Sequence, residues 1–340
     1  MLSRFLGIDL TSTTQTDPTM SLKVIYLVRH GANWHLLVTK FRSNWVLDPQ
    51  TGDYSTNIPC PTGIAIDPAL ASYGIKQSHE LAIHLRTLLP PIERIYSSPF
   101  YRCLQTITPA YYALSSSEMV ADPSVFKIRG ETGLGEWHGT ARFDHPSPAE
   151  PEILKEHFPH YDEKYQAHIK PNITGETIAE LHDRCAYAMH KIIEQSDHEG
   201  VEAILISTHA APLIAIGRVL TGRMPEDVTE EDFRPFTCGL STFERQKSQN
   251  SGSEAQEEEV FNDVQIPRIT WTNKKGVGGS CWKIISNGDC SFLSGGEERG
   301  WKFSGEESFM GSNSCSSLDA GASLGVVTKK KITASDPSML

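Results

Sequence analysis

The chain has 340 residues, of which 39% are hydrophobic and 21% charged, a composition that indicates a folded protein with a sizeable core and excludes wholesale disorder. Its 31 Lys and Arg against 42 Asp and Glu give a formal charge of −11, so we expect no direct binding to nucleic acid. Apolar runs such as residues 211–216 are far shorter than the roughly 20 residues of a membrane-spanning helix, and we expect no membrane segment.

The cysteine pattern indicates the compartment. Seven cysteines, none in a C-x-x-C pair, favour reduced thiols over a disulfide framework or a zinc site. Residues 1–20 lack the apolar stretch of a secretory signal. We therefore expect a cytoplasmic or nuclear protein.

Composition also divides the chain. The 13 histidines all lie at or before His209, whereas glycine is concentrated beyond residue 250. From this we expect a disordered N-terminal extension (1–20), a main domain (21–245), a polar linker (246–260), a short β-rich extension (261–309) and a disordered tail (310–340).

Apolar runs and helical periodicity predict alternating strands and helices in the main domain. In chain order we expect a buried strand over 22–28, a helix over 70–89, a strand over 92–96, a helix from about Pro99, a helix over 175–195, a strand over 201–207 and a helix from Pro212. This alternation predicts an α/β fold, a three-layer sandwich with a mostly parallel central sheet. In the extension, the aromatic segments 268–272, 281–285, 290–293 and 300–303 suggest short strands that either cover the main domain or bind a partner.

Polar residues follow three of the predicted strands. Arg29 and His30 come after the first, Ser97-Ser98-Pro99 after the second, and His209 after the third. Ligands of open α/β sheets bind beyond the carboxyl ends of the strands, so these residues should converge.

The residue types at this edge suit a phosphomonoester. Arginines such as Arg29 and Arg102 can hold phosphate oxygens, and a neutral imidazole can accept a phosphoryl group, which makes His30 the candidate nucleophile. Glu136, in the loop Gly-Leu-Gly-Glu-Trp, is the candidate acid, and Glu131 is the alternative. The other histidines show no metal-ligand spacing: we expect His138, His145, His157 and His160 at the surface or rim, and His182 and His190 at the edge of the 175–195 helix stripe.

Four ordered motifs resemble the histidine phosphatase superfamily, with its phosphoglycerate-mutase-like fold. They are 27–31 (LVRHG), 70–77 (LASYGIKQ), 96–106 (YSSPFYRCLQT) and 206–210 (ISTHA), and the resemblance covers about residues 22–243. Within the superfamily, the sequences of 97–106 and 131–137 are similar to those of the ubiquitin-associated, SH3-containing phosphatases. They are more similar still to fungal phosphatase-domain proteins related to the tau subunit of transcription factor IIIC.

The resemblance implies a role for each of these residues. Arg29, His30, Arg102 and His209 would form the phosphate pocket, His30 would be phosphorylated transiently, and Glu136 would protonate the leaving group, with no metal or organic cofactor. In relatives, a segment like 41–45 (FRSNW) follows the first motif closely, and its arginine reaches the phosphate. Here residues 32–40 intervene, so the position of Arg42, and with it full activity, stays open.

Two functions follow. The first is metal-independent hydrolysis of phosphomonoesters, with either a small molecule or a phosphopeptide as substrate. The alternative is a catalytically weak or inactive subunit of an RNA polymerase III transcription factor complex, similar to transcription factor IIIC, with protein partners.

Overall fold

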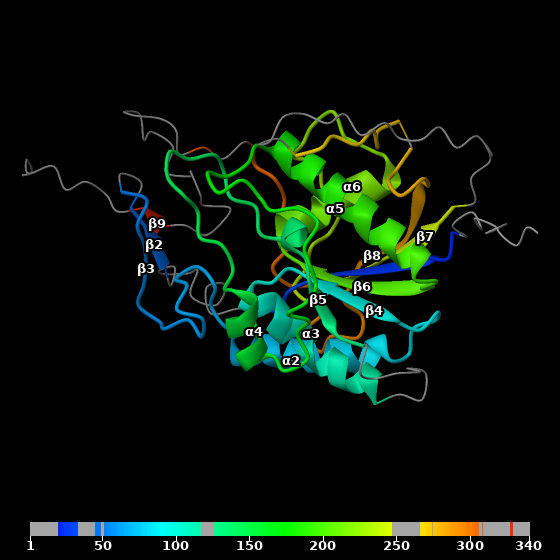
Figure 1. The fold of residues 1–340 in the computed structure, drawn as a ribbon, viewed down its shortest axis with the longest axis horizontal. Coiled ribbons are helices and arrows are strands. Elements are labelled where there is room, and N and C mark those ends of the chain that lie inside the picture. The colour runs from blue at the N-terminus through cyan, green and yellow to red at the C-terminus, as the bar shows by residue number, and fades with distance from the viewer. Residues whose placement is uncertain are drawn as a thin grey trace, which may run out of the picture.

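A six-stranded mixed sheet forms the centre of the computed structural model, which describes residues 20–32, 45–48, 51–116, 126–246, 266–273, 275–305, 308 and 327–328 (Figure 1). The strand order is β5-β4-β6-β1-β7-β8. Four strands are parallel to one another, β1 (Val24–Arg29), β4 (Arg94–Ser97), β5 (Ile128–Gly130) and β6 (Ala203–Thr208), whereas β7 (Leu240–Arg245) and β8 (Trp282–Asp289) form an antiparallel edge.

Helices cover both faces of this sheet. α5 (Ile178–His198) and α6 (Ala210–Thr221) lie on one face, and α2 (Ser72–Leu85), α3 (Tyr101–Ser115) and the short α4 (Pro151–His157) lie on the other (Figure 1). Each face has its own buried apolar cluster. The predicted three-layer α/β sandwich with a mostly parallel sheet is therefore confirmed.

The central strands are buried because helices cover them on both sides. Every residue of β1 and β6 is buried, which explains why residues 24–28 and 203–206 are apolar runs without alternation. A capping box starts α5: the Glu180 N–H donates to the Thr177 hydroxyl at 3.2 Å, and the Thr177 N–H donates to the Glu180 carboxylate at 2.8 Å. The helix thus begins three residues later than predicted.

The segment beyond residue 261 is only partly as expected. The predicted strand at 281–285 overlaps β8, which begins at Trp282 and joins the main sheet beside β7. The segments 268–272, 290–293 and 300–303 form no regular strand, because tight turns and side-chain packing against the main domain fix them instead.

A second, three-stranded sheet lies apart from the main one (Figure 1). It contains β2 (Trp45–Leu47), β3 (Tyr54–Thr56) and β9 (Val327–Thr328). β9 falls in the tail that we expected to be disordered. The rest of that tail, apart from its two strand residues, lies outside the described residues, as do 1–19 and 247–260, so the domain boundaries stay predictions.

Several histidines are placed differently from expectation. His145, His160 and His182 are buried, because each ring stacks or packs against aromatic side chains that the local sequence does not reveal. His182, for example, lies parallel to Trp271 with ring centroids 5.9 Å apart. Among the described helices, none has the length and apolar character needed to cross a bilayer.

Candidate active site

The carboxyl ends of the four parallel strands bring the predicted site residues together. Arg29 ends β1 and His30 follows it, while His209 follows β6 as the N-cap residue of α6. Arg102 is the second residue of α3, which follows β4. Glu136 lies just beyond the 3₁₀ turn η1 (Thr132–Leu134), which follows β5. Because these strands are neighbours, the five side chains lie at one edge of the sheet.

The His30 imidazole is buried and held in one orientation. Its Nδ1 lies 2.8 Å from the Gly31 carbonyl, which can only accept, so Nδ1 carries the proton and Nε2 keeps its lone pair. The His30 N–H donates to the Thr208 carbonyl at 3.0 Å. Burial, with the nearby Arg102 and His209, lowers the pKa of His30 well below 6.5. The ring is therefore neutral at physiological pH, as a nucleophile requires.

Arg102, His209 and Glu136 form a close triangle beside His30. Glu136 Oε2 lies 3.0 Å from Arg102 Nη2 and 3.1 Å from His209 Nδ1, and the latter two atoms are 3.0 Å apart. His209 Nε2 lies 2.8 Å from the Ser98 hydroxyl, and the His209 ring meets the His30 ring edge-on at 5.3 Å.

The charges in this triangle control its protonation. Burial opposes ionisation of Glu136, but His209 and Arg102 more than offset it and hold the pKa of Glu136 well below 4.5. Burial, helped by Arg102 and opposed by Glu136, lowers the pKa of His209 to about 4. At neutral pH the triangle therefore holds one carboxylate, one guanidinium and one neutral imidazole.

Arg102 is held by Asp67, a residue that the sequence did not point to. Its Nη1 donates to the Asp67 carboxylate and to the Ile66 carbonyl, both at 3.2 Å. Asp67 is fully buried and also accepts from the Tyr101 N–H at 2.8 Å, so it fixes the start of α3 as well. Burial, opposed by Arg102, raises the pKa of Asp67 to about 6.

The loop that carries Glu136 is clamped by a second missed pair, Arg184 and Glu176. Arg184 Nε donates to the Glu176 carboxylate at 2.7 Å, and Arg184 Nη1 donates to the carbonyls of Gly133 and Gly135 at 2.8 and 3.1 Å. The Trp137 indole N–H donates to the Glu176 carbonyl at 2.8 Å. Both members of the ion pair are buried, so the loop is fixed on both sides of Glu136.

Glu131, the alternative acid, is engaged elsewhere. It is fully buried and accepts from the Gly133 N–H at 2.9 Å and from the Tyr165 hydroxyl at 3.0 Å. It also accepts from the N–H and the Nδ1 of His168 at 2.9 and 2.8 Å. Four donors satisfy this carboxylate, so its place in the fold is structural, and Glu136 is the better candidate acid.

Arg29 is buried beside the same edge. Its Nη1 donates to the main-chain carbonyls of Pro235 and Arg299 at 2.8 and 2.6 Å. Burial lowers its pKa to about 10, and the guanidinium stays charged at neutral pH. Arg42 and residues 33–40 lie outside the described residues, so the part that Arg42 plays stays a prediction.

Three side chains of this site have the spacing of a cation site. Ligand atoms of His30, Glu136 and His209 lie within 4.8 Å of one another, as metal ligands do. The two buried guanidinium groups of Arg29 and Arg102 make the surroundings favourable for an anion instead.

Comparisons with known proteins agree with this geometry. A model of the histidine phosphatase superfamily (branch 1) matches residues 25–256. The transcription factor tau 55 kDa subunit of Saccharomyces cerevisiae is 33% identical over 293 residues, which cover 84% of this chain and 59% of that protein. The human ubiquitin-associated and SH3 domain-containing protein A is 28% identical over 64% of this chain and 34% of its own length.

Two further matches are phosphatases by name. Ecdysteroid-phosphate phosphatase of Bombyx mori is 29% identical over 52% of this chain and 25% of its own length. A solved structure of the ecdysone phosphate phosphatase from the same organism, in complex with tungstate, covers 68% of this chain and 96% of that chain, with a TM-score of 0.50 and 20% identity, and so shares the fold. The chain spans less than two thirds of the length of each of these curated relatives.

Proposed function

Because the chain belongs to the histidine phosphatase superfamily (branch 1), we propose that it hydrolyses phosphomonoesters through a phosphohistidine intermediate on His30, without a metal ion or organic cofactor. The orientation of His30 carries the proposal. Its Nδ1 is occupied by the Gly31 carbonyl, so Nε2 is the free nucleophilic atom, and it lies at an edge shared with Arg29, Arg102 and His209.

Phosphate binding rearranges the triangle. A phosphomonoester brings negative charge to Arg29 and Arg102 and draws the Arg102 guanidinium away from Glu136. New negative charge beside Glu136 and the weaker contact with Arg102 both raise the pKa of Glu136, so the carboxyl group holds a proton in the complex.

The first step transfers the phosphoryl group to the protein. The Nε2 lone pair of His30 forms a bond to phosphorus while the ester P–O bond breaks, and the proton of Glu136 moves to the leaving oxygen. Arg29, Arg102 and His209 stabilise the charge on the equatorial oxygens.

The second step releases inorganic phosphate. The Glu136 carboxylate takes a proton from a water molecule, whose oxygen attacks phosphorus as the P–N bond to His30 breaks. His30 is then neutral again, and Glu136 loses the proton to solvent once phosphate leaves and its contact with Arg102 re-forms.

Steady-state kinetics test this proposal. The full chain should hydrolyse 4-nitrophenyl phosphate in the presence of a chelator, and His30→Ala should lose about a thousandfold or more of kcat, as expected when a covalent nucleophile is removed. His157→Ala, at an exposed histidine, is the matched control and should keep wild-type rates. Wild-type turnover no faster than that of His30→Ala would contradict the proposal.

A second candidate function rests on the yeast relative. The 33% identity to the transcription factor tau 55 kDa subunit extends over 84% of this chain, which is more than the catalytic edge alone would require. We propose that the chain is also a subunit of a nuclear transcription factor complex, in which its acidic surface leaves DNA contacts to other subunits.

The two functions can be separated. Chain recovered from nuclear extract of its own source should copurify with a fixed set of polypeptides, and His30→Ala should recover the same set, because the fold does not depend on the nucleophile. Recovery of the chain alone would contradict the subunit proposal without affecting the enzymatic one.

A further inference from the structure

The orientation of the Arg29 guanidinium depends on two carbonyls from distant parts of the chain. Both protons of Nη1 are used, one by Pro235 at 2.8 Å and one by Arg299 at 2.6 Å. Nε is buried and has no partner among the described residues. The donors left for a phosphate are therefore Nε and Nη2, which form one edge of the planar group.

Arg299 belongs to the segment after β8, beyond the 25–256 range of the family match. This segment, residues 290–305, is fastened to the main domain at several points. The Ser294 N–H donates to the Glu80 carboxylate of α2 at 3.1 Å, and the Thr237 N–H donates to the Glu298 carbonyl at 3.3 Å.

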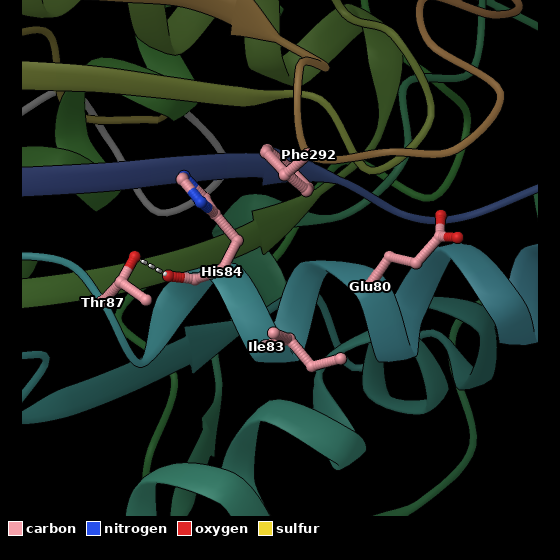
Figure 2. A pocket seen from close by; sticks show the side chains of 5 residues that line it. All are labelled: Glu80, Ile83, His84, Thr87 and Phe292. Atoms are coloured by element: carbon pink, nitrogen blue, oxygen red, sulfur yellow. Dashed lines mark hydrogen bonds between the residues drawn. The ribbon is translucent and has the colours of Figure 1, made fainter.

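An aromatic contact fastens the same segment to α2. Figure 2 shows the Phe292 ring facing the ring of His84, with centroids 4.3 Å apart and planes within 5°. These two rings, with Glu80, Ile83 and Thr87, line a surface pocket that contains none of the candidate site residues. The segment is thereby held next to the end of β1.

Two residues that contact Arg29 have a positive φ, a backbone conformation that residues other than glycine rarely adopt. Among the described residues, three that are not glycine have positive φ, and two of them touch Arg29: Arg299, with φ 55°, and Cys238, with φ 56°. The Cys238 N–H donates to the Arg29 carbonyl at 3.1 Å. Such conformations persist only where surrounding structure enforces them, and they gather at functional sites.

We propose that residues 290–305 are a positioning element of the phosphate site, and that Arg299 acts through its main-chain carbonyl to hold Arg29 ready for phosphate. This inference rests on the proposed function, because a fixed orientation of Arg29 matters only if Arg29 binds the phosphate of a substrate. A guanidinium held in place before the ligand arrives loses less rotational freedom on binding, and this raises affinity. The Arg299 side chain itself is not required.

A pair of substitutions at position 299 tests the inference on the full chain. Arg299→Val and Arg299→Gly remove the same charge, but the β-branched valine disfavours a φ of 55° and glycine accepts it. The probe is inorganic tungstate, a tetrahedral oxyanion, and its dissociation constant is measured by calorimetry. We expect Arg299→Val to bind tungstate about tenfold more weakly than the wild type, the effect of one misplaced charge-assisted hydrogen bond. Arg299→Gly should bind tungstate almost as tightly as the wild type. Equal affinities for the two variants would overturn the inference.

Two controls keep the result interpretable. In an Arg29→Met background the two substitutions should no longer differ in tungstate affinity, and a persisting difference would overturn the inference. If Arg299→Val does not fold, Arg299→Ala, which disfavours positive φ less, replaces it with a smaller expected loss.

A ligand-free readout separates this inference from the proposed function. The Nε–H of Arg29 is buried, so its proton should exchange slowly by NMR in the wild type and in Arg299→Gly, and faster in Arg299→Val. Equal exchange in the two variants would overturn the inference. Absence of tungstate binding or of turnover in the wild type would instead count against the proposed function.

Discussion

Arg102 Nη2 and Glu136 Oε2 lie 3.0 Å apart, so the arginine that we propose binds phosphate is paired with the proposed acid. Asp67 holds the other side of the same guanidinium, with Nη1 and Oδ1 3.2 Å apart. In the free protein Arg102 thus lies between two carboxylates. In the proposed reaction, a phosphate that binds Arg102 draws it away from Glu136, so substrate binding would be linked to protonation of Glu136.

This link predicts the effect of Glu136→Gln. Glutamine cannot donate the proton, so kcat/KM should fall about a hundredfold or more for an alkyl phosphate, and less for 4-nitrophenyl phosphate, whose leaving group needs little protonation. Because the pKa of Glu136 lies well below 4.5 in the free protein, its protonated fraction rises as pH falls. The ratio of wild-type to variant kcat/KM should therefore be largest at low pH. Both substrates are assayed between pH 5 and 8, with exposed Glu163→Gln as control. A ratio independent of leaving group and pH would contradict the role of Glu136.

The buried pair that clamps the Glu136 loop predicts a stability effect. Arg184→Met leaves the Glu176 carboxylate buried without its partner and frees two loop carbonyls, which should cost about 3 to 5 kcal/mol in the free energy of unfolding. The double variant Arg184→Met/Glu176→Gln no longer buries a lone charge and should recover part of that loss. Urea denaturation measures all three chains. A single variant as stable as the double variant would show that the pair does not act as a unit.

His182 predicts how stability depends on pH. Burial lowers its pKa to about 4, below the value near 6.5 of the unfolded chain. Between these values the unfolded chain binds more protons, so the contribution of His182 is fully present above pH 6.5 and is lost as pH falls. Between pH 7 and pH 5 this amounts to about 2 kcal/mol, which His182→Phe should not lose.

The measurement is urea denaturation at the two pH values. The exposed His157→Phe is the matched control and should lose as much stability as the wild type. If His182→Phe also loses as much as the wild type between pH 7 and pH 5, the buried imidazole is not the source of the effect.

Much of the fold and the convergence of the site could be predicted from the sequence. The residues 24–28 of β1 and 203–206 of β6 form apolar runs because helices cover both faces of the sheet. The residues that follow such strands must meet at one edge. This reasoning brings His30, Arg102 and His209 together without any knowledge of side-chain contacts. Glu136 could be chosen as a site residue only with the help of the family resemblance, because carboxylates are common in loops.

The supporting residues could not be predicted in this way. The carbonyls that hold Arg29 come from Pro235 and Arg299, far along the chain, and main-chain contacts leave no signal in residue types. Arg184 is fully buried because Glu176 neutralises it, whereas hydropathy alone places an arginine at the surface. The buried position of His182 depends on Trp271 and Phe303, which helical periodicity does not include.

Direct trapping of the phosphorylated protein tests the central claim best. The full chain is mixed with a ³²P-labelled aryl phosphate, quenched in denaturant within milliseconds and analysed for label on the protein. The account predicts label that is labile to acid and stable to alkali, as phosphohistidine is, that maps to the peptide containing His30, and that is absent from His30→Ala. Turnover by the wild type with no labelled protein at any quench time, or label that persists in His30→Ala, would contradict it.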